Sequence, residues 1–272
     1  MRTTLGAIAL SVLAVPGAFA QTPIPLTVSG NEARGTISLP GGISADLTIS
    51  FESVVGLSPS ALEASARLVT NLSLLGRLPN LATLPLEFPV LLRIGPSASS
   101  NLSFDGVATV TLHTPNLELD PSLPLALFKA TNGGPFRDIT TWEGAGSYRV
   151  GGSTGTFSEF LIVLDLRSID VVISGKLNAL QALLNGNSGS MPPLVATTLQ
   201  TLLTEASTLY HSGETTAAAD PMTAFSNFVI AHSGADIPNV WRANDPTAVN
   251  VAGLLRSAAD TLKFSLDRKA SH

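Results

Sequence analysis

The stretch ISADLTISF, residues 43–51, decides the fold class because its apolar and polar residues alternate. Consecutive side chains of a strand point to opposite faces, so this alternation predicts a strand with one buried face. Strand patterns also occur at 107–113 and 157–165, with weaker ones at 25–29, 90–94, 125–130 and 147–150. Glycine and proline recur between these runs, as they do at the turns of β structure. The pattern predicts an antiparallel β-sandwich.

Residues 61–69 are compatible with a strand or a helix. They are rich in Ala, Leu and Glu, which favour a helix. Their apolar and polar side chains nevertheless alternate strictly, which favours a strand. We therefore expect a strand here, followed by a single helical turn within residues 72–78.

The apolar spacing becomes helical after about residue 170. Apolar stripes predict four helices, with cores at residues 177–184, 194–210, 217–231 and 247–266. Short loops between them indicate an antiparallel hairpin or small bundle. The predicted fold class is therefore α+β and multidomain. Its domains are an N-terminal antiparallel β-sandwich at 21–168 and a C-terminal small helical bundle at 175–268. The apolar residues 169–173 at the joint are compatible with a further strand.

An export leader is predicted over residues 1–20. Arg2 provides the positive start, an apolar run covers 5–15, and AFA at 18–20 fits the small-residue rule of signal peptidase. We expect cleavage between Ala20 and Gln21. The alternative, an uncleaved anchor, is disfavoured because the run is shorter than the ~20 apolar residues that span a bilayer. The predicted location is secreted or periplasmic, in a bacterium.

The composition limits the classes of partner that the chain is expected to bind. Removal of residues 1–20 removes Arg2 and no acidic residue, which takes the net charge from −5 to −6. Such a chain is a poor partner for nucleic acid or anionic lipid, because both need clustered basic residues. The sequence has no cysteine, so neither disulfides nor a bacterial lipid anchor are expected. No second apolar run approaches a membrane span, so we expect no stable membrane insertion after leader removal.

The β half resembles the β-sandwich domain of netrin receptors, ankyrins and their bacterial relatives. The matching motifs are IGP at 94–96, the strand at 107–113 and TFSEF at 156–160. In some members of that family a His-Phe-Ser triplet cleaves itself, with the serine attacking the preceding peptide bond. Phe157 and Ser158 match this triplet, but Thr156 replaces the histidine. A hydroxyl cannot act as the base that activates serine, so we expect an intact chain.

The helical half resembles the FIMAH module, a small helical domain often appended to secreted bacterial proteins. The resemblance covers residues 175–267 and rests on the leucine stripes of the helices and on PMTAF at 221–225. It implies an exported accessory role and supplies no catalytic residue.

The run GGSTG at 151–155 fits the G-x-S-x-G pattern of a hydrolase, with Ser153 as nucleophile. Asp170 with His211 or His232 would supply the usual order of the catalytic triad. A nucleophile elbow, however, needs a helix after the serine, whereas a strand is predicted there. We therefore interpret the run as a hairpin turn.

The triplet His-Ser-Gly occurs at 211–213 and again at 232–234. A paired metal site is one interpretation. The other is helix termination, because histidine favours the negative end of a helix and glycine adopts the left-handed conformation after it. Successive helices of a hairpin end on opposite sides, so the second interpretation is preferred. No metal and no cofactor are predicted.

Trp142 and Trp241 are the binding candidates, since an aromatic side chain in a loop on a rigid sandwich can contact a ligand. The predicted function is that of an exported noncatalytic protein that binds or scaffolds. Its expected partner is an envelope protein, a surface polymer or another copy of itself. The alternatives are a serine hydrolase using Ser153, a self-processing chain using Ser158 and a structural subunit of an envelope assembly. The sequence leaves the ligand and the oligomeric state open.

Overall fold

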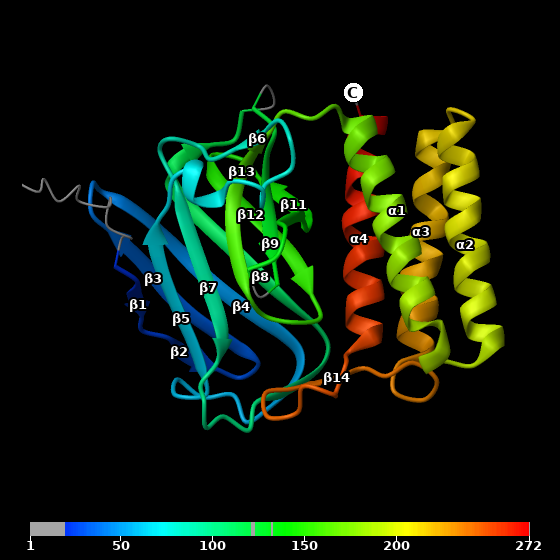
Figure 1. Ribbon diagram of the computed structural model, residues 1–272, viewed down its shortest axis with the longest axis horizontal. Coiled ribbons are helices and arrows are strands. Elements are labelled where there is room, and N and C mark those ends of the chain that lie inside the picture. The colour runs from blue at the N-terminus through cyan, green and yellow to red at the C-terminus, as the bar shows by residue number, and fades with distance from the viewer. Residues whose placement is uncertain (1–19, 121–122, 132, 272) are drawn as a thin grey trace, which may run out of the picture.

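The computed structural model of the protein describes residues 20–120, 123–131 and 133–271. Within these ranges, two antiparallel sheets are followed by four α-helices (Figure 1). The predicted α+β class, a β-sandwich followed by helices, is confirmed. The predicted leader falls, except for Ala20, outside the described residues.

The two sheets each contain seven of the described strands. The first sheet comprises β1 (Thr22–Ile24), β5 (Leu62–Leu68), β6 (Ala82–Thr83), β7 (Val90–Pro96), β9 (Leu125–Ala130), β10 (Arg137–Asp138) and β13 (Glu159–Asp165). The second comprises β2 (Thr27–Ser29), β3 (Glu32–Leu39), β4 (Ile43–Val55), β8 (Ser103–Glu118), β11 (Thr140–Gly144), β12 (Ser147–Thr154) and β14 (Val240–Arg242). Their orders are β1-β5-β7-β13-β9-β10 and β11-β12-β8-β4-β3-β2, with β6 beside β13 and β14 beside β8.

The alternating strands bury one face in the core between the sheets. In β4, Leu47 and Ile49 are at most 1% exposed, and they pack with residues of the opposite sheet. The stretch 61–69 also follows its alternation and forms β5, which confirms the strand. A 3-10 turn, Leu72–Leu74, follows it as expected.

The helices are α1 (Ile169–Asn187), α2 (Pro193–His211), α3 (Thr215–His232) and α4 (Val251–Ala270), with a 3-10 turn at Ser188–Ser190. The further strand considered at 169–173 is wrong, because these residues begin α1. The Ser168 hydroxyl accepts a hydrogen bond from the Val171 N–H and caps the helix, and Asp170 favours its positive end.

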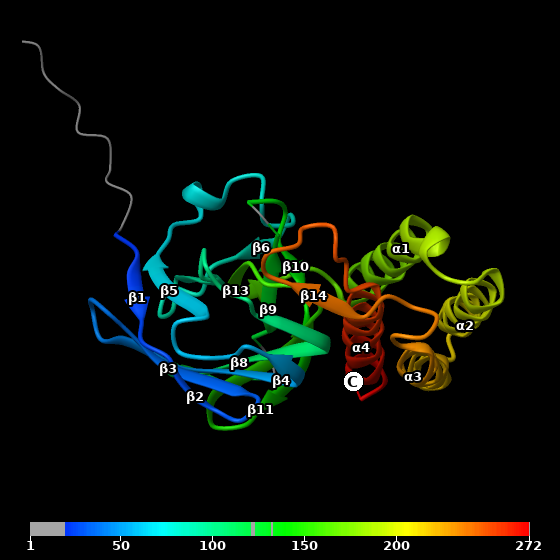
Figure 2. The same ribbon diagram turned by 90° about the horizontal axis from the view of Figure 1, so that it is seen from below.

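The helices form a bundle beside the sandwich, with α4 next to the sheets and α2 farthest from them (Figure 2). The segment between α3 and α4 returns to the sandwich as β14. There Trp241 pairs in register with Phe104 of β8, and its ring lies 5.3 Å from the rings of Phe104 and Phe157. The C-terminal part therefore supplies a strand and an aromatic side chain to the N-terminal sandwich.

The hairpin turn predicted at 151–155 is wrong. Residues up to Thr154 belong to β12 in the second sheet, and the chain then crosses to β13 in the first. The glycines serve close packing instead of a turn. A Cβ at Gly151 would lie 2.1 Å from Trp142 Nε1, and one at Gly155 would lie 2.7 Å from the backbone nitrogen of Leu254 in α4.

Candidate functional site

A cleft of about 690 Å³ lies where the sandwich meets the helices. Residues of β9, β10 and β12 line one side of it, and residues of α1 and α4 line the other. Its charged lining consists of four basic side chains and one acidic one, namely Lys129, Arg137, Arg167, Lys176 and Asp138. The cleft is thus predominantly basic in a chain whose net charge is −5.

Ser153 lies in this cleft with an unused hydroxyl. Its side chain is 6% exposed, and its Oγ is the one buried side-chain nitrogen or oxygen in the described parts of the chain without a hydrogen-bond partner. An unpaired buried hydroxyl costs about 1–3 kcal/mol. This cost is removed when a bound molecule supplies a partner.

Lys129 is a buried lysine at the same cleft. It projects from β9, and its ammonium donates hydrogen bonds to Thr154 Oγ1 at 2.5 Å and Thr156 Oγ1 at 2.6 Å. Burial lowers its pKa from 10.5 to about 7. None of the described carboxylates forms an ion pair with it. Its charge is therefore desolvated without compensation from an anion.

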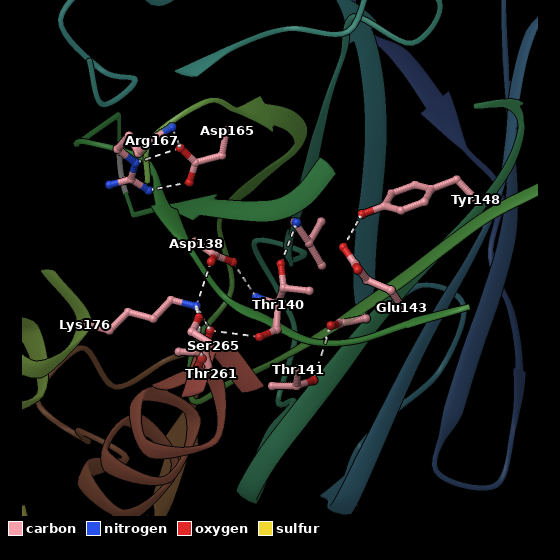
Figure 3. A network of polar contacts seen from close by, with 12 residues as sticks. Asp138, Thr140, Thr141, Glu143, Tyr148, Asp165, Arg167, Lys176, Thr261 and Ser265 are labelled. Atoms are coloured by element: carbon pink, nitrogen blue, oxygen red, sulfur yellow. Dashed lines mark hydrogen bonds and ion pairs between the residues drawn. The ribbon is translucent and has the colours of Figure 1, made fainter. Parts of the chain in front are cut away.

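A second buried lysine, Lys176 of α1, joins both parts of the molecule (Figure 3). Its Nζ lies 2.6 Å from Asp138 Oδ2 on β10. The same ammonium donates to Thr261 O and Ser265 Oγ of α4, at 3.0 and 2.8 Å. Burial lowers the pKa of Lys176, and the nearby Asp138 opposes that shift. One side chain thus ties β10, α1 and α4 together at the wall of the cleft.

Two further contacts hold the cleft in shape. Arg167 pairs with Asp165 through two hydrogen bonds, of 2.7 and 2.6 Å, just before α1 begins (Figure 3). Thr261 of α4 donates to the backbone oxygen of Thr140 in β11 at 2.9 Å. Such a fixed arrangement of strands and helices suits a binding site, because little freedom remains to be lost on binding.

The residues considered for a Ser153 triad do not assemble around it. Asp170 accepts hydrogen bonds from Tyr210 and Lys269, and His232 contacts Asp236. Lys129 does not serve as a base for Ser153 either. Its ammonium donates to Thr154 and Thr156 and forms no hydrogen bond with Ser153.

The two His-Ser-Gly triplets end helices, as one of their interpretations predicted. His211 and His232 are the last residues of α2 and α3, and Gly213 and Gly234 have φ angles of +87° and +78°. The part of the chain that the structure describes contains no group of three or more metal-binding side chains. None of its helices has the length and apolar character of a membrane span.

The tryptophans have different settings. Trp142 lies in β11 and not in the loop expected from the sequence; it is 38% exposed and its ring covers Gly151. Trp241 is part of the aromatic packing described above. Ala20 and Gln21, the predicted cleavage site, are both exposed, and the Gln21 amide donates to Ser65 Oγ at 2.6 Å.

The triplet at 156–158 also has a definite place. Thr156 accepts the hydrogen bond of Lys129, and Phe157 packs against Phe51 and Phe104 at ring distances of 5.8 and 5.4 Å. Ser158 follows, and its backbone oxygen accepts from Ile94 N at 2.9 Å. Phe157 is thus a core residue of the sandwich.

Sequence reasoning missed the two buried lysines, although both carried a signal. Lys129 stands at an inward position of β9, in phase with Leu125 and Leu127. Lys176 interrupts an apolar helical stripe, between Ile173 and Leu180. A lysine in such a position is rarely buried without a specific partner, so the exception indicates a special environment.

No curated protein and no solved structure matches the chain. A family model does match it, over residues 7–270, which is nearly its whole length. The chain therefore belongs to the family of unknown function DUF6689.

Proposed function

We propose that the protein is an exported, noncatalytic binding protein whose ligand site is the cleft between the sandwich and the helices. The observation that carries the proposal is the Ser153 hydroxyl, which is buried in the cleft and lacks a partner among the described residues. The cleft volume of about 690 Å³ is in the range of small-molecule sites, which commonly lie where two structural units meet.

Export is supported by the leader pattern of residues 1–20. Expression of the full chain in a bacterium should give a periplasmic or secreted product whose intact mass corresponds to residues 21–272. An intracellular product that retains residues 1–20 would contradict export. A product cut at Phe157–Ser158 would instead support self-processing.

The noncatalytic role is supported by the setting of Ser153, whose hydroxyl has no described base within hydrogen-bond distance. A fluorophosphonate probe, which labels activated serines, should leave Ser153 unlabelled in the folded protein. Covalent labelling that is lost in Ser153→Ala would favour the hydrolase alternative.

Ligand binding is tested by native mass spectrometry of protein purified without denaturation. Gly175 of α1 lines the cleft, and a Cβ added there meets no atom within 4 Å. Gly175→Trp should therefore project its ring into the open space of the cleft, and Gly175→Ala is its matched control. We expect a co-purified small molecule on the wild-type chain and on Gly175→Ala but not on Gly175→Trp. Equal occupancy of all three would place the ligand elsewhere.

A further inference from the structure

We propose that the cleft takes a small organic carboxylate, with its anionic end at the Lys129 ammonium and its apolar body along α1 and α4. This inference rests on the proposed binding function and names the ligand class. It is argued from charge, from hydrogen-bonding capacity and from the apolar lining.

The charge argument concerns Lys129. An ammonium has three donors, and two of them are used by the hydroxyls of Thr154 and Thr156, which are neutral. Among the other cations of the cleft, Lys176 is paired with Asp138, Arg167 is paired with Asp165, and Arg137 is exposed to solvent. Lys129 is therefore the buried cation of the cleft with no described counter-ion. An anion placed there would compensate the charge of the ammonium, whose hydration burial has removed.

The hydrogen-bonding argument concerns Ser153. Its side chain is more than nine-tenths buried, it lines the cleft, and its Oγ has no partner within the described residues. The hydroxyl donates one hydrogen bond and accepts others, so it suits a polar atom of the ligand. Ser153 and Lys129 reach the cleft from different strands, β12 and β9, which gives two separate points of recognition.

The apolar argument concerns the helical wall. The α1 side contributes Val172, Ala179 and Leu183, and the α4 side contributes Leu254 and Ala258. These small and aliphatic side chains bury a hydrocarbon body but offer it no hydrogen bond. A carboxylate with an aliphatic part can pair with Lys129 on one wall of the cleft and pack against the aliphatic side chains of the other. Inorganic phosphate has no apolar part to pack against the helical wall.

The test is calorimetric titration of the mature full-length chain with octanoate, and with octanamide as the neutral ligand of equal length. We expect octanoate to bind at least about tenfold more tightly, because a hydrogen bond to a charged partner is stronger than a neutral one. Lys129→Met should weaken octanoate about tenfold and leave octanamide nearly unchanged. Lys263→Met is the matched control, since Lys263 pairs with Asp267 on α4 and does not line the cleft.

The two Gly175 variants test whether octanoate binds in the cleft. Gly175→Trp should abolish octanoate binding and Gly175→Ala should retain it. Ser153→Ala should weaken the binding of octanoate about threefold to tenfold, as expected for a lost hydrogen bond. A thermal melt of each variant establishes that it is folded before titration.

The outcomes separate the ligand class from the binding function. Equal affinity for octanoate and octanamide, or an unchanged octanoate affinity in Lys129→Met, would overturn the carboxylate assignment. If octanoate does not bind but native mass spectrometry finds another ligand that Gly175→Trp removes, the ligand class is wrong and the binding function stands. If neither experiment detects a ligand in the cleft, both proposals fail.

Discussion

At the scale of single residues, Lys129 is the least typical side chain of the sandwich. It faces inward from β9, and its partners are the hydroxyls of Thr154 and Thr156. Burial lowers its pKa to about 7, from 10.5 in the unfolded chain. Below pH 7 both states carry the proton, so the full cost of burying the charge is present. Between about pH 7 and 10.5 the folded state has lost the proton and the unfolded state still holds it, so stability rises with pH.

We therefore predict that Lys129→Met stabilises the protein near neutral pH, by on the order of 1–3 kcal/mol, because it removes a buried charge. The advantage should shrink steadily between pH 7 and 10. Urea unfolding of both proteins at several pH values measures it, with Lys263→Met as an exposed control. A constant difference between wild type and variant across this range would show that Lys129 keeps its ordinary pKa.

At the scale of elements, the start of α4 is fixed by Asn250, which is fully buried. Its Oδ1 accepts from the Gly253 N–H at 2.8 Å and so caps the helix. Its Nδ2 donates to the backbone oxygen of Gly106 in β8 at 2.6 Å. A Cβ at Gly253 would lie 2.3 Å from that same oxygen, so the helix end and the strand are in direct backbone contact.

Asn250→Ala should destabilise the protein by about 2–4 kcal/mol, since it removes a cap and leaves the half-buried carbonyl of Gly106 without this donor. Ser168→Ala is the matched comparison, because Ser168 caps α1 with one exposed bond of 3.4 Å. Its expected cost is about 0.5–1 kcal/mol. Chemical denaturation measures both values. Equal costs would mean that the contact to Gly106 contributes nothing.

Gly175 gives a second test within an element. It lies in the middle of α1, where glycine is less favourable than alanine, and a Cβ there meets open space. Gly175→Ala should raise stability by about 0.5–1 kcal/mol. A loss of stability in a thermal melt would instead contradict the open space beside Gly175.

At the scale of the whole molecule, the ion pair of Lys176 with Asp138 and the strand β14 join the sandwich to the helices. Breaking a buried ion pair on one side leaves an uncompensated charge, which costs about 3–5 kcal/mol. Removing both charges avoids that cost. The contribution of the ion pair to stability can therefore be measured with a double-mutant cycle.

Asp138→Ala should destabilise the protein by about 3–5 kcal/mol, and Asp138→Ala with Lys176→Met should recover most of this loss.

Both tryptophans lie in strands of the sandwich, whereas circular dichroism is dominated by the helices. For the wild-type chain we expect one unfolding transition, coincident by fluorescence and by circular dichroism. Two separate transitions would show that the parts unfold independently.

Much of the fold was predictable because its periodicities are local. Residues 43–51 and 61–69 alternate, and both form strands. The four helices also follow their apolar stripes. The turn at 151–155 was wrongly predicted because glycine serves both turns and close packing. The close packing comes from Trp142 beside Gly151 and from Leu254 beside Gly155. No local sequence pattern predicts that these two residues approach the glycines.

The candidate site was less predictable. The G-x-S-x-G pattern identified Ser153 as a candidate nucleophile. The acid and base that such a hydrolase needs are not its neighbours in space. The strand β14 was missed because it has three residues and exists through pairing with β8. Lys129 and Lys176 were overlooked because a lysine is ordinarily solvated, and its burial depends on which surfaces meet over it.

The sequence by itself determined the fold class, a β-sandwich followed by helices. Strands bury every second residue and helices every third or fourth, so the spacing of apolar residues distinguishes them. Its first twenty residues also predict export. Tertiary structure alone decided that β12 and α1 face each other across a cleft, with Ser153 and Lys129 in its wall. The reason is physical: a buried charge or an unpaired hydroxyl arises where residues far apart in the chain exclude water together, and local spacing does not encode that meeting.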